Sequence, residues 1–409
     1  MVAEGALFEL GVLFAVLAFV GVIATPLRQS VIPLYILSGL VLSPFVAGRI
    51  SPYALEATEF IELGAELGIV FLLLFLGLEF NLERLFESRE RITKVGLIDF
   101  AFNFGGGMLL GYAIFRSFLP AFLLAGIVYI SSSAIITKSL IDLGWIANDE
   151  ADPMLGTLVF EDLVIAVYLI AASALFLGGG DVSAAIRSAA LAFGFVLALS
   201  LLVYFGTPFF QRVLETDSNE FFVLRVVGIT VLIAGAALVL GVSEAVAAFF
   251  VGMAFSSTDR VERLERLLES VRDLFAAIFF AWIGLVTDPV LFASVVVPVV
   301  LAVLVTTPTK LASGFVGGRI YGLDARRSTR VALGMTTRGE FSLIIAALAL
   351  SAAGGSLSTE LAQTMYAFAV AYVLVMSVLG TTLMQYSTPI ESIVVSRLIR
   401  GEIRRVRSN

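Results

Sequence analysis

The sequence predicts an all-α protein that crosses a lipid bilayer about thirteen times. Hydrophobic residues make up 59% of its 409 residues and charged residues only 14%, and the mean hydropathy is +1.01. A soluble domain is closer to half apolar and a quarter charged, so this chain needs lipid around much of its surface. Apolar runs long enough to span a membrane, about 20 residues, recur along the whole chain.

Turn signals separate the apolar runs. Thr25-Pro26 closes the first run, Gly178 to Asp181 follows the sixth, Gly206 to Pro208 follows the seventh, and Gly354-Gly355 separates the last two. No loop is long enough to form a soluble domain. The spans are expected at residues 7–24, 30–48, 60–80, 93–115, 119–141, 153–177, 184–205, 221–240, 241–257, 272–288, 290–317, 330–353 and 359–386.

The basic residues predict the orientation. With the N-terminus outside, most of the 26 Lys and Arg residues fall in cytoplasmic loops, and only Arg49, Arg116 and Arg187 fall outside. This bias follows the positive-inside rule and places the C-terminus in the cytoplasm. The first run follows acidic Glu4 rather than a basic stretch, which argues against a signal peptide.

The two halves of the chain resemble each other. The segment around Gly39 in span two is similar to that around Gly252 in span nine, and the segment around Gly77 in span three to that around Gly284 in span ten. We therefore expect a first repeat at 1–177, a linker helix at 178–220, a second repeat at 221–390 and a basic tail at 391–409. An odd number of spans separates the repeats, so they are inverted, as in many secondary transporters.

Two residue types are missing altogether. The chain has neither cysteine nor histidine, which excludes disulfides, thiolate chemistry and the most common metal ligand. Proton chemistry therefore falls to carboxylates and lysine. Dinucleotide and P-loop signatures are also absent, and the basic residues lie in short loops rather than on one nucleic-acid-binding face.

Two adjacent carboxylates, Glu161 and Asp162, lie in the middle of span six with apolar residues on both sides. Ionisable residues are costly in hydrocarbon, so inside a span they usually mark a transport pathway. Neighbouring helical residues point about 100° apart, so the two cannot face one ligand equally. We expect Asp162 to bind a monovalent cation or a proton, and Glu161 to hold a partner or to line the cavity.

Two further spans carry polar segments that predict broken helices. Span five contains Ser131, Ser132 and Ser133, and span twelve contains Gly339 among polar and charged residues. Such segments favour an unwound backbone that faces a cavity, although Ser and Thr also bond to the preceding helical turn. The candidate residues of span twelve are Thr336, Thr337, Arg338 and Glu340.

Lys310 lies well inside span eleven, and either Glu161 or Asp162 is its expected counter-ion. Four other acidic residues are weaker candidates for a transport role, since each lies near a span end or beside polar residues. They are Glu79, Asp99, Glu244 and Asp273.

These segments together resemble the monovalent cation:proton antiporter family, in the branch of Kef-type and NapA-type exchangers. The likeness covers nearly the whole chain, and short strings carry it in order along the sequence. They are Leu27-Arg28-Gln29, Leu37-Ser38-Gly39-Leu40 with Pro44, Leu73 to Phe80, Ser131 to Ala134, Phe160-Glu161-Asp162, Ser243-Glu244-Ala245 and Arg338 to Phe341.

The resemblance implies a homodimeric transporter of a prokaryotic plasma membrane, with spans five and twelve crossing in a core domain. Asp162 would be the ion-binding aspartate, Ser131 to Ser133 would supply oxygen ligands, and Lys310 would be the basic partner. Exchange of Na⁺, favoured over K⁺, for H⁺ by elevator-like alternating access would need no cofactor. Family members commonly have Asp, Asn or Gln where this chain has Glu161. The chain also ends soon after its last span, so we expect no nucleotide-sensing domain.

Three other functions rank below exchange. A cation channel would need a pore built from rings of residues, and no segment resembles a filter loop. A symporter of a small organic anion would need binding groups for a larger substrate. An intramembrane enzyme would have to use Glu161 and Asp162 as an acid pair, and adjacent helical residues diverge.

Overall fold

A computed structural model describes residues 2–27, 30–50, 54–79, 82–177, 194, 210–239, 244–256 and 258–394. Across these ranges the regular structure is helical, apart from one isolated bridge between Ala353 and Leu357. The helices are α1 (Val2–Leu27), α2 (Ile32–Leu42), the 3-10 turn η1 (Ala47–Arg49), α3 (Glu59–Glu79), α4 (Leu82–Phe115), α5 (Phe118–Tyr129), α6 (Ser133–Asp142), α7 (Ala151–Leu177), α9 (Asn219–Val239), α10 (Glu244–Ser256), α11 (Val261–Val286), α12 (Leu291–Ile320), α13 (Ala325–Gly334), α14 (Glu340–Ser351) and α15 (Thr359–Gln385).

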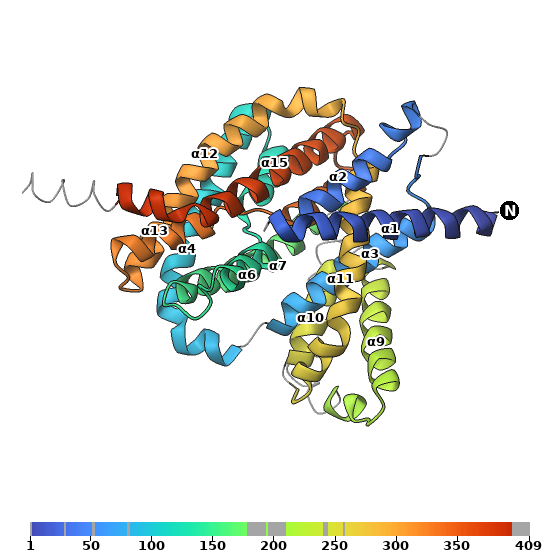
Figure 1. Cartoon of the computed structure of the whole chain (residues 1–409), viewed down its shortest axis with the longest axis horizontal. Coiled ribbons are helices and arrows are strands. Elements are labelled where there is room, and N and C mark those ends of the chain that lie inside the picture. Colours follow the sequence, from blue (N-terminus) through green and yellow to red (C-terminus); the bar gives the residue numbers. More distant parts are fainter. Residues whose placement is uncertain are drawn as a thin grey trace, which may run out of the picture.

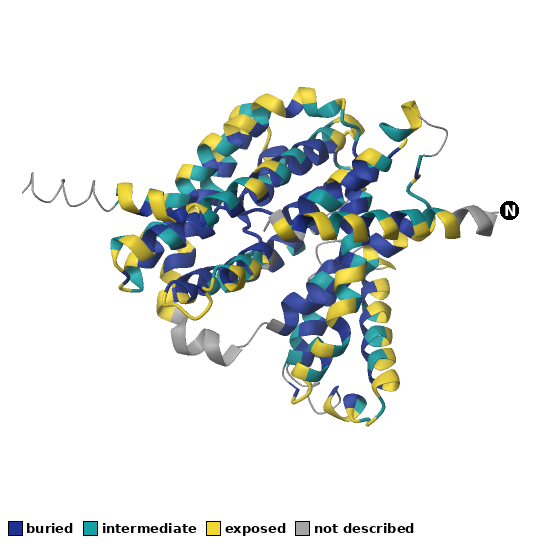
Figure 2. Cartoon of the chain, viewed as in Figure 1, coloured by how far each residue is buried: buried dark blue, intermediate teal, exposed yellow. Residues whose placement is uncertain are grey.

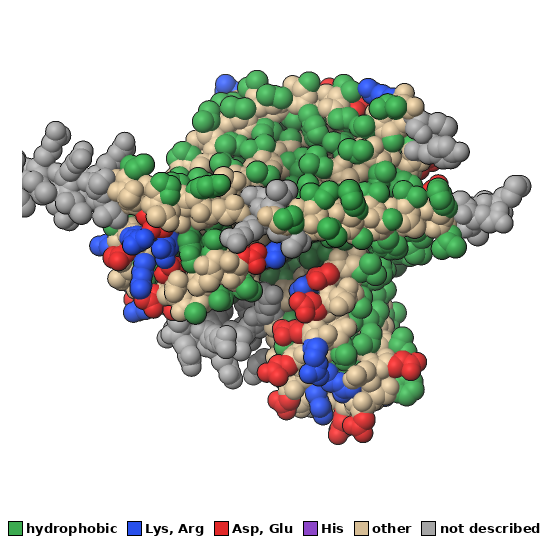
Figure 3. All heavy atoms as spheres, in the orientation of Figure 1, with side chains coloured by type: hydrophobic (Ala, Val, Ile, Leu, Met, Phe, Trp, Pro, Cys, Tyr) green, Lys and Arg blue, Asp and Glu red, His purple; other side chains and the backbone are tan. Residues whose placement is uncertain are grey.

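The predicted all-α membrane architecture is confirmed. Eight helices of the described ranges are long and apolar enough to cross a bilayer, and α5, α10 and α14 are shorter apolar helices. Exposed large hydrophobic side chains cover the outer faces of α1, α9 and α12, as lipid contact requires (Figures 2 and 3). The seventh predicted span, 184–205, lies outside the described residues except for residue 194.

Two helices begin about three turns earlier than predicted. α4 starts at Leu82 rather than at 93, and α11 starts at Val261 rather than at 272. The first turns of α11 are charged, but Leu264 and Leu268 are buried on one face, four residues apart. An amphipathic extension of this kind forms helix without being apolar enough to count as membrane-spanning.

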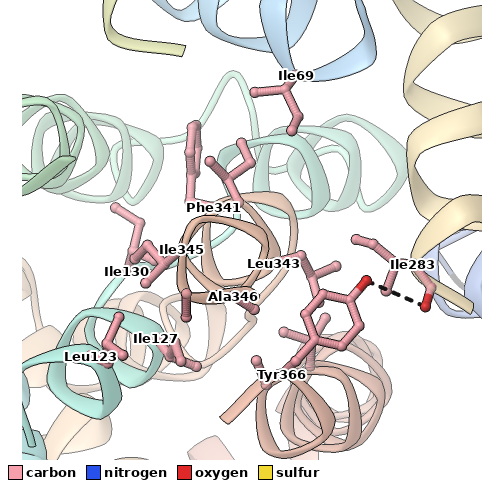
Figure 4. Close-up of a cluster of buried hydrophobic side chains, with 14 of the residues drawn as sticks. Ile69, Leu123, Ile127, Ile130, Ile283, Phe341, Leu343, Ile345, Ala346 and Tyr366 are labelled. Atoms are coloured by element: carbon pink, nitrogen blue, oxygen red, sulfur yellow. Dashed lines mark hydrogen bonds between the residues drawn. The ribbon is translucent and has the colours of Figure 1, made fainter. Parts of the chain in front are cut away.

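The helices form two groups (Figure 1). The first helix group contains α1, α2, α3, α9, α10 and α11, and the second contains α4 to α7 and α12 to α15. The groups touch mainly where α10 meets α7 and where α15 meets α2. The Tyr366 hydroxyl of α15 also reaches the Ile283 carbonyl of α11 at 3.4 Å, beside the buried side chains of α14 (Figure 4).

Within the first helix group, glycines bring pairs of helices into backbone contact. A methyl group on Gly39 of α2 would overlap the Ala281 carbonyl of α11, and one on Gly284 would overlap the α2 backbone in return. Gly77 of α3 and Gly252 of α10 face each other in the same way. Small residues permit this close approach in membranes. The predicted repeat equates α2 with α10 and α3 with α11, so a contact between α2 and α11 implies a matching contact between α10 and α3. The repeat and its boundaries stay predictions.

Candidate functional site

The second helix group contains a crossing of two broken helices, at the two places where the polar segments predicted them. α5 ends at Tyr129 and α6 begins at Ser133, with Ile130 and Ser132 in extended conformations between them. The Ser132 hydroxyl accepts a hydrogen bond from the backbone N–H of Ile135 at 3.2 Å and so caps α6. A serine side chain offers the backbone this alternative to continuous helix.

The second break lies between α13, which ends at Gly334, and α14, which begins at Glu340. The two breaks bond to each other: the Ser132 N–H donates to the Thr337 carbonyl at 3.3 Å, and the Ser131 hydroxyl donates to the Met335 carbonyl at 3.2 Å. At Gly339 any side chain would start 2.5 Å from the Ser132 hydroxyl oxygen, so only glycine fits there.

Arg338 neutralises the carboxyl-terminal ends of two half-helices. Its side chain is fully buried, and its Nε donates to the Val128 carbonyl near the end of α5 at 2.9 Å. Its Nη1 donates to the three carbonyls that follow α13, those of Met335, Thr336 and Thr337, at 3.2, 3.1 and 2.9 Å. Helix C-termini carry partial negative charge and unpaired carbonyls, and one guanidinium satisfies both here.

Glu340 occupies the opposite position, at the amino-terminal ends of the other two half-helices. It begins α14, and its carboxylate accepts hydrogen bonds from the hydroxyls of Ser132 at 2.5 Å and Ser133 at 3.2 Å, where α6 begins. A negative charge is stabilised at helix N-termini. Arg338 and Glu340 therefore balance the backbone charges of the crossing.

Beside the crossing lies an ion-pair cluster formed by Lys310, Glu161 and Asp99. The Lys310 Nζ on α12 lies 2.6 Å from Glu161 Oε1 on α7 and 2.7 Å from Asp99 Oδ2 on α4. It also donates to the Tyr129 carbonyl at 3.4 Å. Lys310 and Glu161 are completely buried and Asp99 is 1% exposed. The predicted pairing of Lys310 is thus with Glu161, together with a second carboxylate.

Asp99 was underestimated by the sequence reasoning, which placed it among the weak candidates. Its Oδ1 accepts hydrogen bonds from Asn103 Nδ2 at 2.9 Å and from the Ser313 hydroxyl at 2.7 Å. Thr309 in turn donates to Asn103 Oδ1 at 2.9 Å. A signal existed in the sequence, because Asp99 and Asn103 are four residues apart within one apolar span and so share a helix face.

Glu161 and Asp162 have different surroundings, although they are neighbours on α7. Glu161 accepts hydrogen bonds from the Ser131 N–H at 2.6 Å and hydroxyl at 3.1 Å, in addition to its pair with Lys310. Asp162 is 6% exposed, whereas Glu161 is completely buried. The two carboxylates thus differ in burial, and the expectation that they face different ligands stays a prediction.

A cavity of about 620 Å³ lies between the two helix groups and reaches the crossing. Tyr35, Phe75 and Arg272 line it from the first helix group. Ser133, Lys138 and Glu340 line it from the second. Water-sized molecules can therefore approach the amino-terminal ends of α6 and α14.

The remaining candidates lie in several places. Asp273 also lines the cavity, whereas Glu244 begins α10 in the first helix group. Thr336 and Thr337 reach Arg338 through their backbone carbonyls. The side chain of Glu79 lies outside the described residues. In the part of the chain that the structure describes, no three Asp or Glu side chains converge as a multivalent metal site would require.

Comparison with known proteins identifies the family of this chain. A family model described as the transmembrane sodium/hydrogen exchanger matches residues 12–386. The chain belongs to that family. It is therefore a multi-pass membrane protein related to cation/proton antiporters, as the motif resemblance predicted.

Two curated relatives match most of the chain. The K(+)/H(+) antiporter subunit KhtU of Bacillus subtilis is 37% identical over 376 residues, 91% of each protein. The ammonium/H(+) antiporter subunit AmhT of Alkalihalophilus pseudofirmus is 30% identical over 392 residues, 94% of each protein. Both are named as transporters rather than enzymes.

A solved structure supports the fold. The sodium proton antiporter MjNhaP1 from Methanocaldococcus jannaschii superposes with a TM-score of 0.69 and 16% sequence identity, over 94% of this chain and 99% of that one. The second helix group, with its broken helices, is thus part of an antiporter fold.

Proposed function

We propose that this protein exchanges a monovalent cation for a proton across the membrane, with Asp162 as the carboxylate that binds either ion. The observation that carries this proposal is the contrast between Asp162 and Glu161. Glu161 is sealed from solvent and already bonded to Lys310 and Ser131, whereas Asp162 retains 6% exposure on the same helix. Asp162 is thus the more accessible of the two adjacent carboxylates.

One carboxylate suffices for exchange. Burial in apolar surroundings favours the neutral, protonated form of a carboxylate, and a cation that binds there must displace the proton. Hydroxyls and backbone carbonyls complete the oxygen ligands that a hard cation prefers. The Ser131 to Ser133 segment and the carbonyls of the breaks are the nearest candidates. Because proton and cation compete for one site, only one of them crosses at a time.

Alternating access follows from the two helix groups. The cavity lies between them, and they share few contacts, so the second helix group can move against the first without repacking its interior. We propose an elevator-like movement of that group. By the positive-inside rule Lys138 and Arg272 are cytoplasmic, so the cavity opens to that side. A homodimer in a prokaryotic plasma membrane, formed through the first helix group, is part of the same proposal.

The movement can be tested by cross-linking, since the chain has no native cysteine. Ala277 on α11 and Ile141 on α6 line opposite sides of the cavity. The double variant Ala277→Cys/Ile141→Cys is treated with bismaleimide cross-linkers of different lengths. Short cross-linkers should stop exchange and long ones should permit it. Each single variant, treated in the same way, should keep its exchange rate. Full transport by the quantitatively short-linked protein would rule out relative movement of the groups.

The cation remains to be identified. The family resemblance favours Na⁺ over K⁺, whereas the two relatives described above are named for K⁺ and ammonium, which are similar in size. Proton movement in proteoliposomes, followed with a pH-sensitive dye, distinguishes Na⁺ from K⁺. Na⁺, K⁺, Li⁺ or Rb⁺ is added to acid-loaded vesicles, and the cation that alkalinises the lumen at the lowest concentration is the preferred substrate.

The same assay tests the role of Asp162. Asp162→Asn should abolish alkalinisation by every cation while the protein stays monodisperse. Asp152→Asn is the matched control, because Asp152 is an exposed aspartate in the first turn of the same helix, and it should retain wild-type rates. Full exchange by Asp162→Asn would refute the assignment, and no response from the wild type to any cation would refute antiport.

A further inference from the structure

The ion-pair cluster contains more negative than positive charge. Two carboxylates, Asp99 and Glu161, contact one ammonium group, that of Lys310. Since all three side chains are buried, no bulk water screens the difference. A Lys310–Glu161 pair alone would be neutral; with both carboxylates ionised by their contacts to the ammonium group, Asp99 adds one excess negative charge.

Asp99 is held as a fixed acceptor rather than exposed as a binding group. Three donors reach its two oxygens: Lys310 Nζ at 2.7 Å, Asn103 Nδ2 at 2.9 Å and the Ser313 hydroxyl at 2.7 Å. The side chain does not line the cavity, and it lies on α4, on a different helix from Glu161 and Asp162. Both oxygens of Asp99 already accept hydrogen bonds from protein donors, so the side chain is held by the protein rather than presented to the cavity.

Lys310 in turn is saturated by the contacts it already makes. Its three protons point to Asp99, to Glu161 and to the Tyr129 carbonyl. It cannot also neutralise Asp162 without giving up one of them. The excess charge of the cluster is thus left to act on the neighbouring residue of α7, which is Asp162.

We propose that Asp99 is a positioning residue that sets the cation affinity of Asp162 through its charge, without touching the ion. This inference rests on the proposed function. The carboxylate of Asp99 gives the otherwise neutral Lys310–Glu161 pair a net negative charge. This net charge attracts a monovalent cation that is bound at Asp162. A unit charge about 10 Å away at an effective dielectric constant of about 20 changes an affinity about tenfold.

The test separates charge from structure. Asp99→Asn removes the charge and keeps the shape of the side chain, and Asp99→Glu keeps the charge and changes the length. Ser313→Ala removes one hydrogen bond to Asp99 and leaves every charge in place. For each reconstituted variant, the apparent KM and kcat are measured with the cation that drives wild-type exchange best.

The expected pattern is a KM effect that follows the charge. Asp99→Asn should raise the cation KM about tenfold and leave kcat within about twofold of wild type. Asp99→Glu and Ser313→Ala should stay within about threefold of the wild-type KM. If Asp99 had a purely structural role, all three variants would instead have a lower kcat or a lower yield. Asp99→Glu would then be impaired as well, although it keeps the charge.

Two outcomes overturn the inference: an unchanged cation KM in Asp99→Asn, or the same tenfold rise in Ser313→Ala. If Asp99→Asn does not fold, Asp99→Glu decides alone. Because it keeps the charge, a KM within threefold of wild type supports the inference and a tenfold rise overturns it. A wild-type protein that moves no protons in response to any cation refutes the proposed antiport itself, which is a separate result.

Discussion

The crossing and the ion-pair cluster bury charge in opposite ways. At the crossing, Arg338 binds four backbone carbonyls and Glu340 binds two serine hydroxyls beside helix N-termini, so each charge meets the opposite end of helix dipoles. At the cluster, one lysine meets two carboxylates. The crossing is thus balanced by the backbone, and the cluster is not balanced at all. This difference indicates that the crossing charges maintain an unwound fold, and it leaves the cluster charges available for the role in ion binding that we propose.

Arg338→Met should have the largest effect on the folded state, since it removes a donor from four buried carbonyls, of which only those of Met335 and Thr337 keep another. Each buried polar group that loses its partner costs about 1–3 kcal/mol, so the Val128 and Thr336 carbonyls together cost about 2–6 kcal/mol. We expect little monodisperse protein and a strongly lowered melting temperature in detergent. Arg338→Lys keeps the charge but has fewer hydrogen-bond donors, so its melting temperature should lie between those of the wild type and Arg338→Met. Wild-type melting of Arg338→Met would show that the crossing does not depend on this charge.

Lys310→Met should also be strongly destabilising, but for the opposite reason. It leaves Asp99 and Glu161 as neighbouring buried carboxylates without a cation, and removing one partner of a buried pair costs about 3 kcal/mol or more. The cluster differs from the crossing in one testable respect, because a second substitution at the cluster should restore part of the lost stability. Lys310→Met/Asp99→Asn removes one of the two carboxylate charges that Lys310→Met leaves unpaired, and with it their mutual repulsion, and should recover part of the lost melting temperature. If the double variant melts below the single one, the carboxylates do not repel each other.

The smallest effect is expected from a third set of charges, at the end of the chain that follows α15. Glu391 accepts hydrogen bonds from Arg326 Nε at 2.6 Å and Arg330 Nε at 2.8 Å, and Arg330 also donates to Glu150 at 2.7 Å. Both arginines are partly exposed. Because partly exposed pairs contribute little, Glu391→Gln should cost about 1 kcal/mol or less.

The stability that this third set of charges contributes should decrease as the pH falls. Burial alone would raise the pKa of Glu391, but the hydrogen bonds from Arg330 and Arg326 outweigh it and hold the pKa below its ordinary value. The stabilisation is therefore present above the pKa of an unfolded glutamate, about 4.3, and is lost as the pH falls through the lower folded-state pKa. The melting difference between wild type and Glu391→Gln should vanish in acid and shrink in high salt. A difference that does not shrink at all as the pH falls below that of an unfolded glutamate would contradict the ion pairing.

The helices were largely predictable, because membrane spans must be apolar over a fixed length. The polar segments around Ser132 and Gly339 likewise predicted both breaks, since side chains that bond their own backbone interrupt helices. The early starts of α4 and α11 were missed because their first turns are charged and form helix beyond the apolar segment.

The partners inside the site were harder to predict. The four-residue spacing of Asp99 and Asn103 indicates a shared polar face, but it does not reveal what that face meets, so the pairing of Asp99 with Lys310 could not be predicted. The roles of Arg338 and Glu340 were also hidden, because their partners are mostly backbone groups more than 200 residues away in the chain or exposed by the breaks themselves. Only the folded arrangement shows that these two residues balance helix ends.

The contacts of Lys310 have a mechanical consequence. They connect α4, α7 and α12, three helices that are widely separated in the sequence. Sliding any one of these helices past the other two would pull apart opposite charges in a medium without water, at a cost of several kcal/mol. The three helices must therefore travel together through every conformational step. If the proposed exchange is correct, the compartment around Asp162 accordingly keeps its shape on both sides of the membrane, and the same cation is preferred in both directions of transport.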